Sequence, residues 1–400
     1  MIEIHSKALK KSIKINRIIG HHRGSQNGPT LIFTAGVHGN EPSGVFALQR
    51  LMDNLDQKSI SCSGNIYAIS GNLNALEKGI RFSQLDLNRI WTQENIDAMM
   101  TDRGQHIPAE IEEQIDLYKT IETILKSESG PFYFFDLHTT SSETVPFITV
   151  NDSLLNRAFT KQYPLPIVLG IEEFLHGPML SYINELGYVA FGFEAGQHDA
   201  PVAYENQLSF IYLSLAFTGC VSLSEPSVMK HLQRLRSHTS VAQQFFEIVY
   251  HHKVNESSDF KMEPGYVNFQ KIKKHEHLAA QSGIPVTAPR SGKIFMPLYQ
   301  GKGEDGFFII KKTPKFFLGL SKLLRKVYFD RFLALLPGIK WGTGKREELI
   351  VDLKVARFFT KQFFHLLGYR SKQLDATHLR MKNREVASRN DDYKGTSWLK

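Results

Sequence analysis

LIFTAGVHGNEPSG, residues 31–44, is the stretch that decides the fold of the first half of the chain. Its first seven residues are apolar and β-prone, which is typical of a short strand buried between two layers of helices. The glycines that follow permit tight backbone geometry, and Pro42 suits the first turn of a helix. The pattern predicts a strand, a sharp turn and a helix, with His38 and Glu41 at the turn.

The pair formed by His38 and Glu41 is a candidate metal site. Ligands bind at the carboxyl ends of strands in open α/β sheets, and a histidine three residues before a glutamate has donor atoms able to share one metal ion. The same spacing also occurs where a surface histidine lies beside a glutamate that caps a helix. The short pattern therefore leaves both interpretations open.

The composition indicates a globular protein. The chain has 400 residues, of which 42% are hydrophobic and 22% charged, and this length suggests two or three domains. Cys62 and Cys220 are too few for a disulfide framework and lack the C-x-x-C spacing of a zinc ribbon. No window reaches the roughly 18 uncharged apolar residues of a membrane helix, and the N-terminus lacks the apolar core of a signal peptide. We expect a cytoplasmic protein without a transmembrane segment.

Helix-like and strand-like segments alternate through residues 1–254, after a hairpin expected in residues 1–30. This alternation predicts an α/β domain with a mixed central sheet and helices on both faces. A long polar connection at 72–95 is of a length that is usually functional. Strands are expected at residues 64–70, 132–137, 145–150, 167–169 and 188–193, and helices at 106–126, from about 154, at 179–185, 203–217 and 228–250.

The composition changes after residue 254. Residues 255–312 contain short β-prone pieces between glycines and prolines, which predicts a small all-β domain. Within it, residues 286–294 resemble the barrel-sandwich fold of lipoyl and biotinyl carriers. Residues 313–400 alternate aromatic and basic residues, with helices expected at 316–336 and 349–367, and we expect a loosely ordered end from residue 371.

The positive charge of the chain lies at one end. The net charge is +8, but residues 311–400 alone carry +13 and residues 1–310 carry −5. Two interpretations of the extension stay open. In the first, the helix is an amphipathic cap on the rest of the protein and buries Phe316, Phe317, Leu320, Leu323 and Leu324. In the second, residues 313–400 bind an anionic partner such as nucleic acid or a membrane surface. The spacing of the apolar residues favours the cap. The sequence contains no motif for specific nucleic-acid recognition.

Four features fall at the ends of expected strands or in the long connection. Two histidines and one carboxylate among them would leave the fourth position of a catalytic metal site open for water. The features are the motifs H-G-N-E at residues 38–41, R-F-S-Q-L-D-L-N-R at 81–89, D-L-H-T-T at 136–140 and F-E-A-G at 193–196.

In this order and context, the four motifs resemble the succinylglutamate desuccinylase/aspartoacylase family, a branch of the zinc carboxypeptidase superfamily. The resemblance spans roughly residues 30–200. It implies one Zn²⁺ per chain, bound by His38, Glu41 and His138, with Asp136 beside the third ligand. It also implies that Glu194 is the general base that takes a proton from water and returns it to the leaving amine.

The resemblance assigns further roles to the connection at 72–95. Arg81 matches the family position that polarises the scissile carbonyl, where a fixed cation stabilises an oxyanion. Asn88 and Arg89 match the pair that holds a substrate carboxylate, for which arginine offers a bidentate fork. Asp86 is expected to orient this loop rather than to react.

The chain departs from the family pattern at positions that contact substrate. Asn184 stands where acetylaspartate-cleaving members have a second arginine, and Phe307 and Phe308 stand near the family's substrate-contacting tyrosine. We expect a less acidic or larger amide than a small diacidic acyl-amino acid. Tyr299 is a candidate replacement for the tyrosine, and His198 either lines the pocket or is structural.

The sequence therefore predicts a zinc-dependent amidohydrolase that deacylates a small-molecule N-acyl amino acid or a related amide, acting on a non-peptide carbon–nitrogen bond. One alternative is a zinc carboxypeptidase that cuts a peptide-like end, with Arg89 on the terminal carboxylate. Another is a binding module that uses its basic tail for an anionic partner, although such a module does not need Glu194. The sequence does not set the oligomeric state, and a homo-oligomer is compatible with it.

Overall fold

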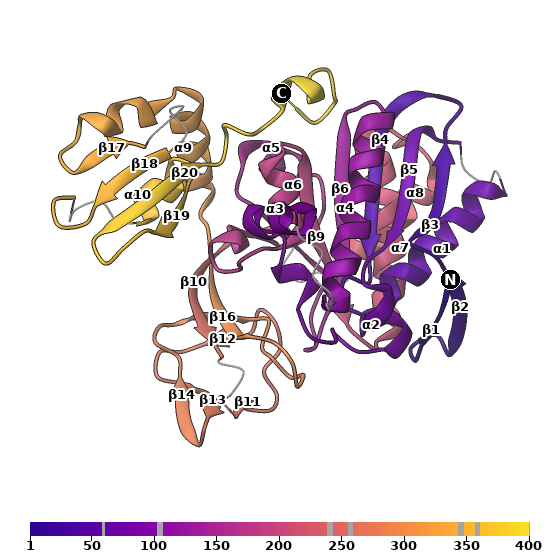
Figure 1. Cartoon of the computed structure of the whole chain (residues 1–400), viewed down its shortest axis with the longest axis horizontal. Coiled ribbons are helices and arrows are strands. Elements are labelled where there is room, and N and C mark those ends of the chain that lie inside the picture. The colour runs from indigo at the N-terminus through magenta and orange to yellow at the C-terminus, as the bar shows by residue number, and fades with distance from the viewer. Residues whose placement is uncertain are drawn as a thin grey trace.

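A computed structural model describes residues 1–57, 61–101, 107–237, 243–254, 259–342, 348–356 and 361–399. These residues form a large α/β unit, a β-rich extension below it and a separate C-terminal unit beside it (Figure 1). None of the described helices is long and apolar enough to cross a membrane.

One mixed sheet runs through the centre of the chain. Within the described residues it has eleven strands, and parallel pairing joins β4 to β5 and β6, β6 to β9, β7 to β8 and β8 to β10. The order across the sheet is β3 (Ile18–Arg23), β5 (Ser63–Ser70), β4 (Gln26–Ala35), β6 (Phe132–Thr140), β9 (Val189–Gln197), β7 (Phe147–Val150), β8 (Ile167–Leu169), β10 (Phe245–Lys253), β16 (Asp305–Lys312), β15 (Gly292–Phe295) and β12 (Lys271–Ile272).

Helices cover both faces of this sheet, so its central strands are apolar on both sides. Phe33 of β4 packs in one core cluster and its neighbour Ile32 in the other. The first face carries α1 (Ser43–Asp56), α5 (Leu154–Thr160), α7 (Pro201–Thr218) and α8 (Pro226–Ser237), and the second carries α3 (Gln93–Thr101), α4 (Ala109–Ser127) and α6 (Met179–Glu185). The prediction of a mixed α/β sheet with helices is confirmed.

The helix expected at residues 228–250 is wrong in its second half. The helix α8 ends at Ser237, and β10 begins at Phe245, beyond residues 238–242, which lie outside the described part. Phe246 and Ile248 are buried while Glu247 between them is exposed, which is the two-residue period of a strand. An apolar run of this length fits either period, and pairing with β8 and β16 decides for the strand.

The β-rich extension is continuous with the central sheet. Its strands β12, β15 and β16 extend the sheet beyond β10, while a separate three-stranded sheet contains β11 (Phe260–Met262), β13 (His277–Gln281) and β14 (Ile284–Thr287). The expected N-terminal hairpin is β1 (Ile2–Ser6) with β2 (Lys11–Ile15). The division into domains at residues 254 and 312 stays a prediction, as does the barrel-sandwich likeness.

The C-terminal unit contains a sheet that the sequence did not suggest. Leu349 and Val351 are buried at alternate positions of β18, so the helix expected from residue 349 is wrong there. The unit comprises α9 (Lys315–Lys326), the 3₁₀ helix η3 (Phe329–Leu335), β17 (Ile339–Trp341), β18 (Glu348–Asp352), α10 (Lys361–Leu366), β19 (Tyr369–Gln373) and β20 (His378–Asn383), with sheet order β17-β18-β20-β19.

The end of the described chain makes specific contacts with the α/β unit, whereas a loosely ordered end from residue 371 was predicted. It leaves β20, passes back to the α/β unit and includes the 3₁₀ helix η4 (Asn390–Tyr393) (Figure 1). The hydroxyl of the fully buried Tyr393 accepts a hydrogen bond from the amide of Val189, at 2.9 Å, and donates to the carbonyl of Phe132. Trp398 donates from Nε1 to the hydroxyl of Tyr133, at 3.2 Å. The polar composition of this segment led to a prediction of loose order. Average composition does not reveal the few buried aromatic side chains that hold the segment in place.

Of the residues expected to be buried by the α9 cap, Phe316, Phe317 and Leu323 are exposed and Leu320 and Leu324 are partly buried. Phe316 is 72% exposed and Leu323 59% exposed, whereas Arg325 is only 7% exposed. The cap prediction assumed that the apolar stripe would turn inward. The position of α9 is instead set by polar contacts that its buried arginine makes.

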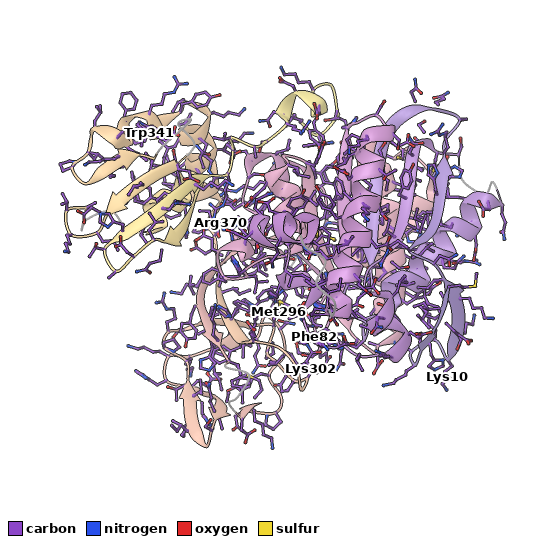
Figure 2. The ribbon with its side chains drawn as sticks, in the orientation of Figure 1. Lys10, Phe82, Met296, Lys302, Trp341 and Arg370 are labelled. Carbon is purple, nitrogen blue, oxygen red and sulfur yellow. The ribbon has the colours of Figure 1, made fainter. Side chains whose placement is uncertain are left out.

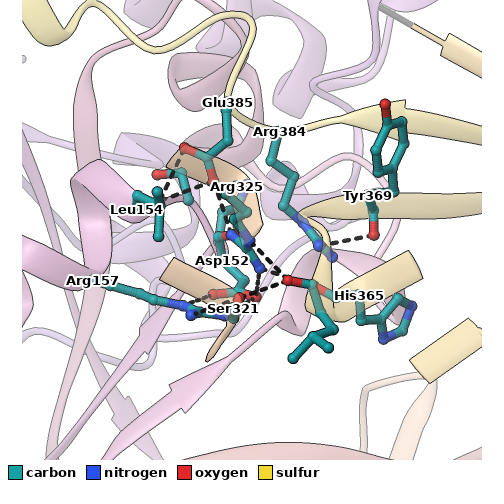
Figure 3. A network of polar contacts seen from close by, with 12 residues as sticks. Asp152, Leu154, Arg157, Ser321, Arg325, His365, Tyr369, Arg384 and Glu385 are labelled. Carbon is teal, nitrogen blue, oxygen red and sulfur yellow. Dashed lines mark hydrogen bonds and ion pairs between the residues drawn. The ribbon is translucent and has the colours of Figure 1, made fainter. Parts of the chain in front are cut away.

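A buried network of ion pairs attaches the C-terminal unit to the α/β unit (Figure 3). Nη2 of Arg325 lies 2.9 Å from Oδ2 of Asp152, and its Nη1 lies 2.8 Å from Oε1 of Glu385. Arg157 also pairs with Asp152, and these arginines hold the pKa of the Asp152 carboxyl far below its usual range against the opposing effect of burial. Arg384 pairs with Glu172 and Glu173 nearby.

Removing Arg325 should destabilise the attachment of the C-terminal unit. Arg325→Met removes this partner from the buried Asp152 and the partly buried Glu385, and because Arg157 still pairs with Asp152 the cost stays below the roughly 3–5 kcal/mol of a fully broken buried pair. We expect a lower thermal unfolding midpoint and faster amide hydrogen exchange in residues 315–383. The matched control is Arg380→Met, which removes an exposed pair with Glu348 worth about 0–1 kcal/mol. Equal effects of the two variants would contradict this account.

Candidate active site

The register of the central sheet brings the candidate residues together. In the pairing of β6 with β9, His138 lies opposite Glu194, and in the pairing of β4 with β6, Ala35 lies opposite Leu137. His38 follows Ala35 by three residues. Parallel strands end at the same edge of a sheet, so residues far apart in the chain meet there.

The turn between β4 and α1 requires glycine at two positions. Gly36 has a φ of 71°, in the left-handed region. A Cβ on Gly39 would lie 2.0 Å from the carbonyl carbon of Ala75, so no side chain fits. The amide of Glu41 donates to the carbonyl of His38, at 3.1 Å. This turn points His38 and Glu41 toward the end of β6.

Three buried side chains form a cluster with the donor atoms of a metal site. Nδ1 of His38 lies 2.8 Å from Oε1 of Glu41, and Nδ1 of His138 lies 3.2 Å from Oε2 of Glu41. One ligand atom from each residue lies within 4.8 Å of the others. His38, Glu41 and His138 are at most 7% exposed.

Each histidine of the cluster is oriented by a second carboxylate. Nε2 of His38 lies 3.2 Å from Oδ1 of Asp86, and Nε2 of His138 lies 2.7 Å from Oδ2 of Asp136. These contacts leave the Nδ1 atoms facing Glu41. Carboxylates placed behind histidines in this way fix the ring orientation of metal ligands. Asp86 was expected to orient only its own loop, and its contact with His38 was not predicted.

Burial and charge act in opposite directions on the cluster. Burial by itself raises the pKa of Glu41, but His38 and His138 outweigh it and hold that pKa well below its usual value. Burial likewise lowers the pKa of His138, and the carboxylates of Asp136 and Glu41 reverse this and raise it. Without a cation, the negative charge of Glu41 depends on its two histidines.

Glu194 is a buried carboxylate with an unused oxygen. It is 6% exposed, and its Oε2 has no hydrogen-bond partner among the described residues. Burial raises its pKa to about 8, with Glu41 and Asp136 adding to the rise and His138 and Arg81 opposing it. A carboxyl group with a pKa near neutrality can both accept and release a proton.

Arg81 lies against the same cluster. Its Nη1 is 3.6 Å from Oε1 of Glu41 and its Nη2 is 3.2 Å from Oδ2 of Asp86. Its Nε is buried and has no hydrogen-bond partner among the described residues. The guanidinium is therefore fixed beside the cluster with donor capacity left over, as stabilisation of a developing oxyanion requires.

Asn88 and Arg89 are both engaged by neighbouring elements. Oδ1 of Asn88 accepts from the amide of Met179, at 3.0 Å, and Nη2 of Arg89 donates to Oδ2 of Asp305, at 2.7 Å. His251 lies 2.8 Å from the other oxygen of Asp305. Asp305 was not predicted, because nothing in the sequence indicates that β16 approaches the loop at residues 81–89.

All seven predicted site residues line one pocket, together with His198. These seven are His38, Glu41, Arg81, Asn88, Arg89, His138 and Glu194. Another wall comes from the β-rich extension, with Met296, Leu298 and Gln300. The ammonium of Lys302 lies 4.8 Å from the ring centre of Phe82, which fastens this extension loop to the α/β unit (Figure 2).

The structure shows what surrounds the residues at which the chain departs from the family pattern. The Asn184 amide donates to the carbonyls of Leu180 and Ala190, at 2.7 and 3.0 Å, and Asn184 is not among the lining residues. Phe308 lines the pocket, whereas Tyr299 does not and donates its hydroxyl to the carbonyl of Glu263. The side chains at these positions therefore offer the pocket no additional hydrogen-bond donor.

The donor set fits a metal ion. Two imidazole nitrogens and one carboxylate facing a common point are the protein ligands of a site with an open position. The two carboxylates behind the histidines complete this arrangement. The unpartnered oxygen of Glu194 lies in the same pocket.

Comparison with known proteins agrees with this geometry. The model of the succinylglutamate desuccinylase/aspartoacylase catalytic domain matches residues 27–213. Succinylglutamate desuccinylases of Pseudomonas fluorescens (strain SBW25) and Photorhabdus laumondii subsp. laumondii are both 32% identical, over 65 and 75 residues, which are 16% and 19% of this chain and 20% and 22% of theirs. The chain thus spans about a fifth of the length of the curated relatives it matches.

Solved structures extend the likeness of fold. A succinylglutamate desuccinylase/aspartoacylase from Rhodobacter sphaeroides superposes with a TM-score of 0.54 at 15% identity, over 76% of this chain and 91% of that one. The ectoine utilization protein EutE (DoeB) from Ruegeria pomeroyi gives a TM-score of 0.51 at 18% identity, over 72% and 87%. Residues 27–213 are thus similar to the catalytic domain of the succinylglutamate desuccinylase/aspartoacylase family, and the chain shares the fold of these solved structures.

Proposed function

We propose that this protein is a zinc-dependent hydrolase that cleaves an amide bond and releases a carboxylate and an amine. The observation that carries the proposal is the buried cluster of His38, Glu41 and His138 in one pocket with the unpartnered carboxyl of Glu194. These three residues would hold Zn²⁺, which supplies polarisation of a water molecule and of the substrate carbonyl when it is bound.

The residues around the cluster have complementary roles in this reaction. Glu194 accepts a proton from the attacking water and later donates it to the leaving amine, which its raised pKa favours. Arg81 lies where it can stabilise the oxyanion that forms at the carbonyl. Asp136 and Asp86 hold His138 and His38 in place throughout.

The pocket walls favour a substrate with little negative charge. The arginines among its described lining residues are Arg81 and Arg89, and Arg89 already pairs with Asp305. The remaining wall is largely apolar, with Ile171, Leu175, Leu180, Phe191, Met296 and Phe308. An N-acyl amino acid with an apolar side chain or acyl group fits this wall better than a diacid. A peptide-like end is the second candidate, because one carboxylate is within the capacity of Arg89.

Glu194→Gln should abolish turnover and keep the metal. The amide is close in size to the carboxyl group but cannot exchange a proton, and loss of general acid–base catalysis costs about 10²–10⁴ in rate. The measurements are zinc content and the rate of amide hydrolysis. Glu205→Gln, on the exposed surface of α7, is the control and should leave both unchanged. Undiminished turnover in Glu194→Gln would remove Glu194 from the mechanism.

His38→Ala should lose the metal. Wild-type protein is expected to hold about one zinc ion per chain, and removal of one of three protein ligands leaves too few to retain it. Elemental analysis after dialysis measures the zinc-to-protein ratio. His5→Ala, at an exposed histidine of β1, should retain the wild-type ratio. A His38→Ala protein that still binds zinc with wild-type affinity would rule out His38 as a ligand.

Substrate preference should follow the pocket walls. We expect kcat/KM for N-acetyl-leucine or N-acetyl-phenylalanine to exceed that for N-succinylglutamate and N-acetylaspartate by at least about tenfold, because a second carboxylate would be desolvated without a cation. Asp305→Asn removes the negative charge that pairs with the Arg89 guanidinium, which can then bind a substrate carboxylate. The ratio of kcat/KM for the apolar substrates to kcat/KM for the diacids should therefore become smaller. Faster cleavage of short peptides would favour the carboxypeptidase candidate, and a preference for the diacids would contradict the proposed specificity.

A further inference from the structure

The segment of α9 and η3 exposes several large apolar side chains to solvent. Six large apolar side chains in this segment are between 49% and 79% exposed. Single exposed apolar residues are normal on a globular protein, whereas several in one short segment indicate an interaction site. We call this surface the α9–η3 face, defined by Phe316, Phe317, Leu323, Val327, Phe332 and Leu335.

The apolar stripe of α9 is exposed to solvent. Phe316, Leu323 and Val327 follow the helical period and lie on one side of the helix. At 100° per residue, Ser321 and Arg325 lie on the opposite side, and both are buried. The helix therefore buries Ser321 and Arg325 and exposes Phe316, Leu323 and Val327, while Leu318 and Leu324 are partly buried.

The buried side of α9 is held in place, so the face cannot turn inward at low cost. Arg325 pairs with Asp152 and Glu385, and the hydroxyl of Ser321 donates to the carbonyl of Leu366, at 2.7 Å (Figure 3). Rotation of the helix would separate Arg325 from both carboxylates and leave Asp152 with Arg157 as its remaining arginine partner of the two. Removing one partner of a buried ion pair costs about 3–5 kcal/mol, which opposes this rotation.

The α9–η3 face is also strongly basic. Residues 311–340 contain eight lysines and arginines and a single acidic residue, Asp330. Seven of the basic residues are exposed, and the eighth is Arg325. Asp330 accepts hydrogen bonds from Tyr369 and Asn383, so it is directed toward its own sheet. On α9, Lys315, Lys322 and Lys326 form a second stripe about 100° from the apolar one.

An apolar stripe with a row of lysines along one side suits a helix that lies in the plane of an anionic membrane surface. The phenylalanines and leucines enter the boundary between headgroups and acyl chains, while the lysines contact the anionic headgroups. A nucleic acid would use the lysines and the aromatic rings but would gain nothing from Leu323, Val327 and Leu335. A second copy of the same face would bring like charges together.

We propose that the α9–η3 face docks this protein reversibly on a bilayer surface that contains anionic lipids. The proposal is independent of the amide hydrolysis proposed above, because it rests on residues far from the pocket in the chain. It assigns the basic charge of residues 311–400 to membrane attraction rather than to the substrate.

The test is cosedimentation of the full-length protein with vesicles. One set is pure phosphatidylcholine and the other contains about a third phosphatidylglycerol. We expect binding to the anionic vesicles, weakened by salt because lysine contacts are screened. Phe316→Ser with Leu323→Ser, and separately Lys322→Glu with Lys326→Glu, should each weaken this binding by about tenfold or more.

Matched controls use exposed residues elsewhere on the chain. Leu223→Ser with Met229→Ser removes two exposed apolar side chains near α8, and Lys11→Glu with Lys230→Glu reverses two exposed charges. Both control proteins should bind the anionic vesicles as the wild type does. Because all these positions are exposed, unchanged thermal unfolding of every variant checks that the fold is intact.

Several outcomes would overturn the proposal. These are absence of vesicle binding, equal binding to neutral vesicles, and equal losses in the α9 and control variants. Sedimentation that shows a dimer broken by Phe316→Ser with Leu323→Ser, without vesicle binding, would assign the face to self-association. Binding to a single-stranded oligonucleotide but not to vesicles would assign it to nucleic acid. Loss of amide hydrolysis in Glu194→Gln with vesicle binding intact would separate the two proposals.

Discussion

The buried carboxylate of Glu41 is the charge around which the α/β unit is organised. Its oxygens are hydrogen-bonded to His38 and His138 and accept from the amide of Thr139, at 2.8 Å. A buried carboxylate is costly unless several groups compensate it. Those groups come from the ends of β4 and β6, so satisfying Glu41 requires the two strands to lie in their observed register. The chemistry of the site and the order of the sheet are therefore linked.

The sequence predicted the parts of the site that lie next to strands. His38, Glu41, His138 and Glu194 follow or end apolar runs, and parallel pairing gathers such positions at one edge of a sheet. The pocket wall formed by Met296, Leu298, Gln300 and Asp305 was not predictable in the same way. It depends on β16 pairing with β10, which has no local signal. Contacts between distant segments leave little trace in one sequence.

Errors in secondary structure were concentrated where apolar runs are short. Residues 245–250 and 349–352 were assigned to helices, yet both are strands whose burial alternates. A short apolar run is compatible with either period, and the pairing partner decides between them. The C-terminal residues from 371 were expected to be loosely ordered from their polarity, but Tyr393 and Trp398 anchor them. Average composition does not report such single anchors.

The orientation of α9 illustrates a limit of the amphipathic pattern. The hydrophobic stripe predicts which side of a helix is apolar, and it is usually assumed that this side is buried. In α9 the ion pairs of the buried Arg325 with Asp152 and Glu385 oppose that assumption, since turning the stripe inward would remove the guanidinium from both carboxylates. The pairing of buried charges, which organises the site around Glu41, thus also acts on α9, where it keeps the apolar stripe exposed. A helix fixed in this way keeps its apolar side chains free to contact a membrane or another molecule. The neighbouring lysines favour a partner whose surface is anionic.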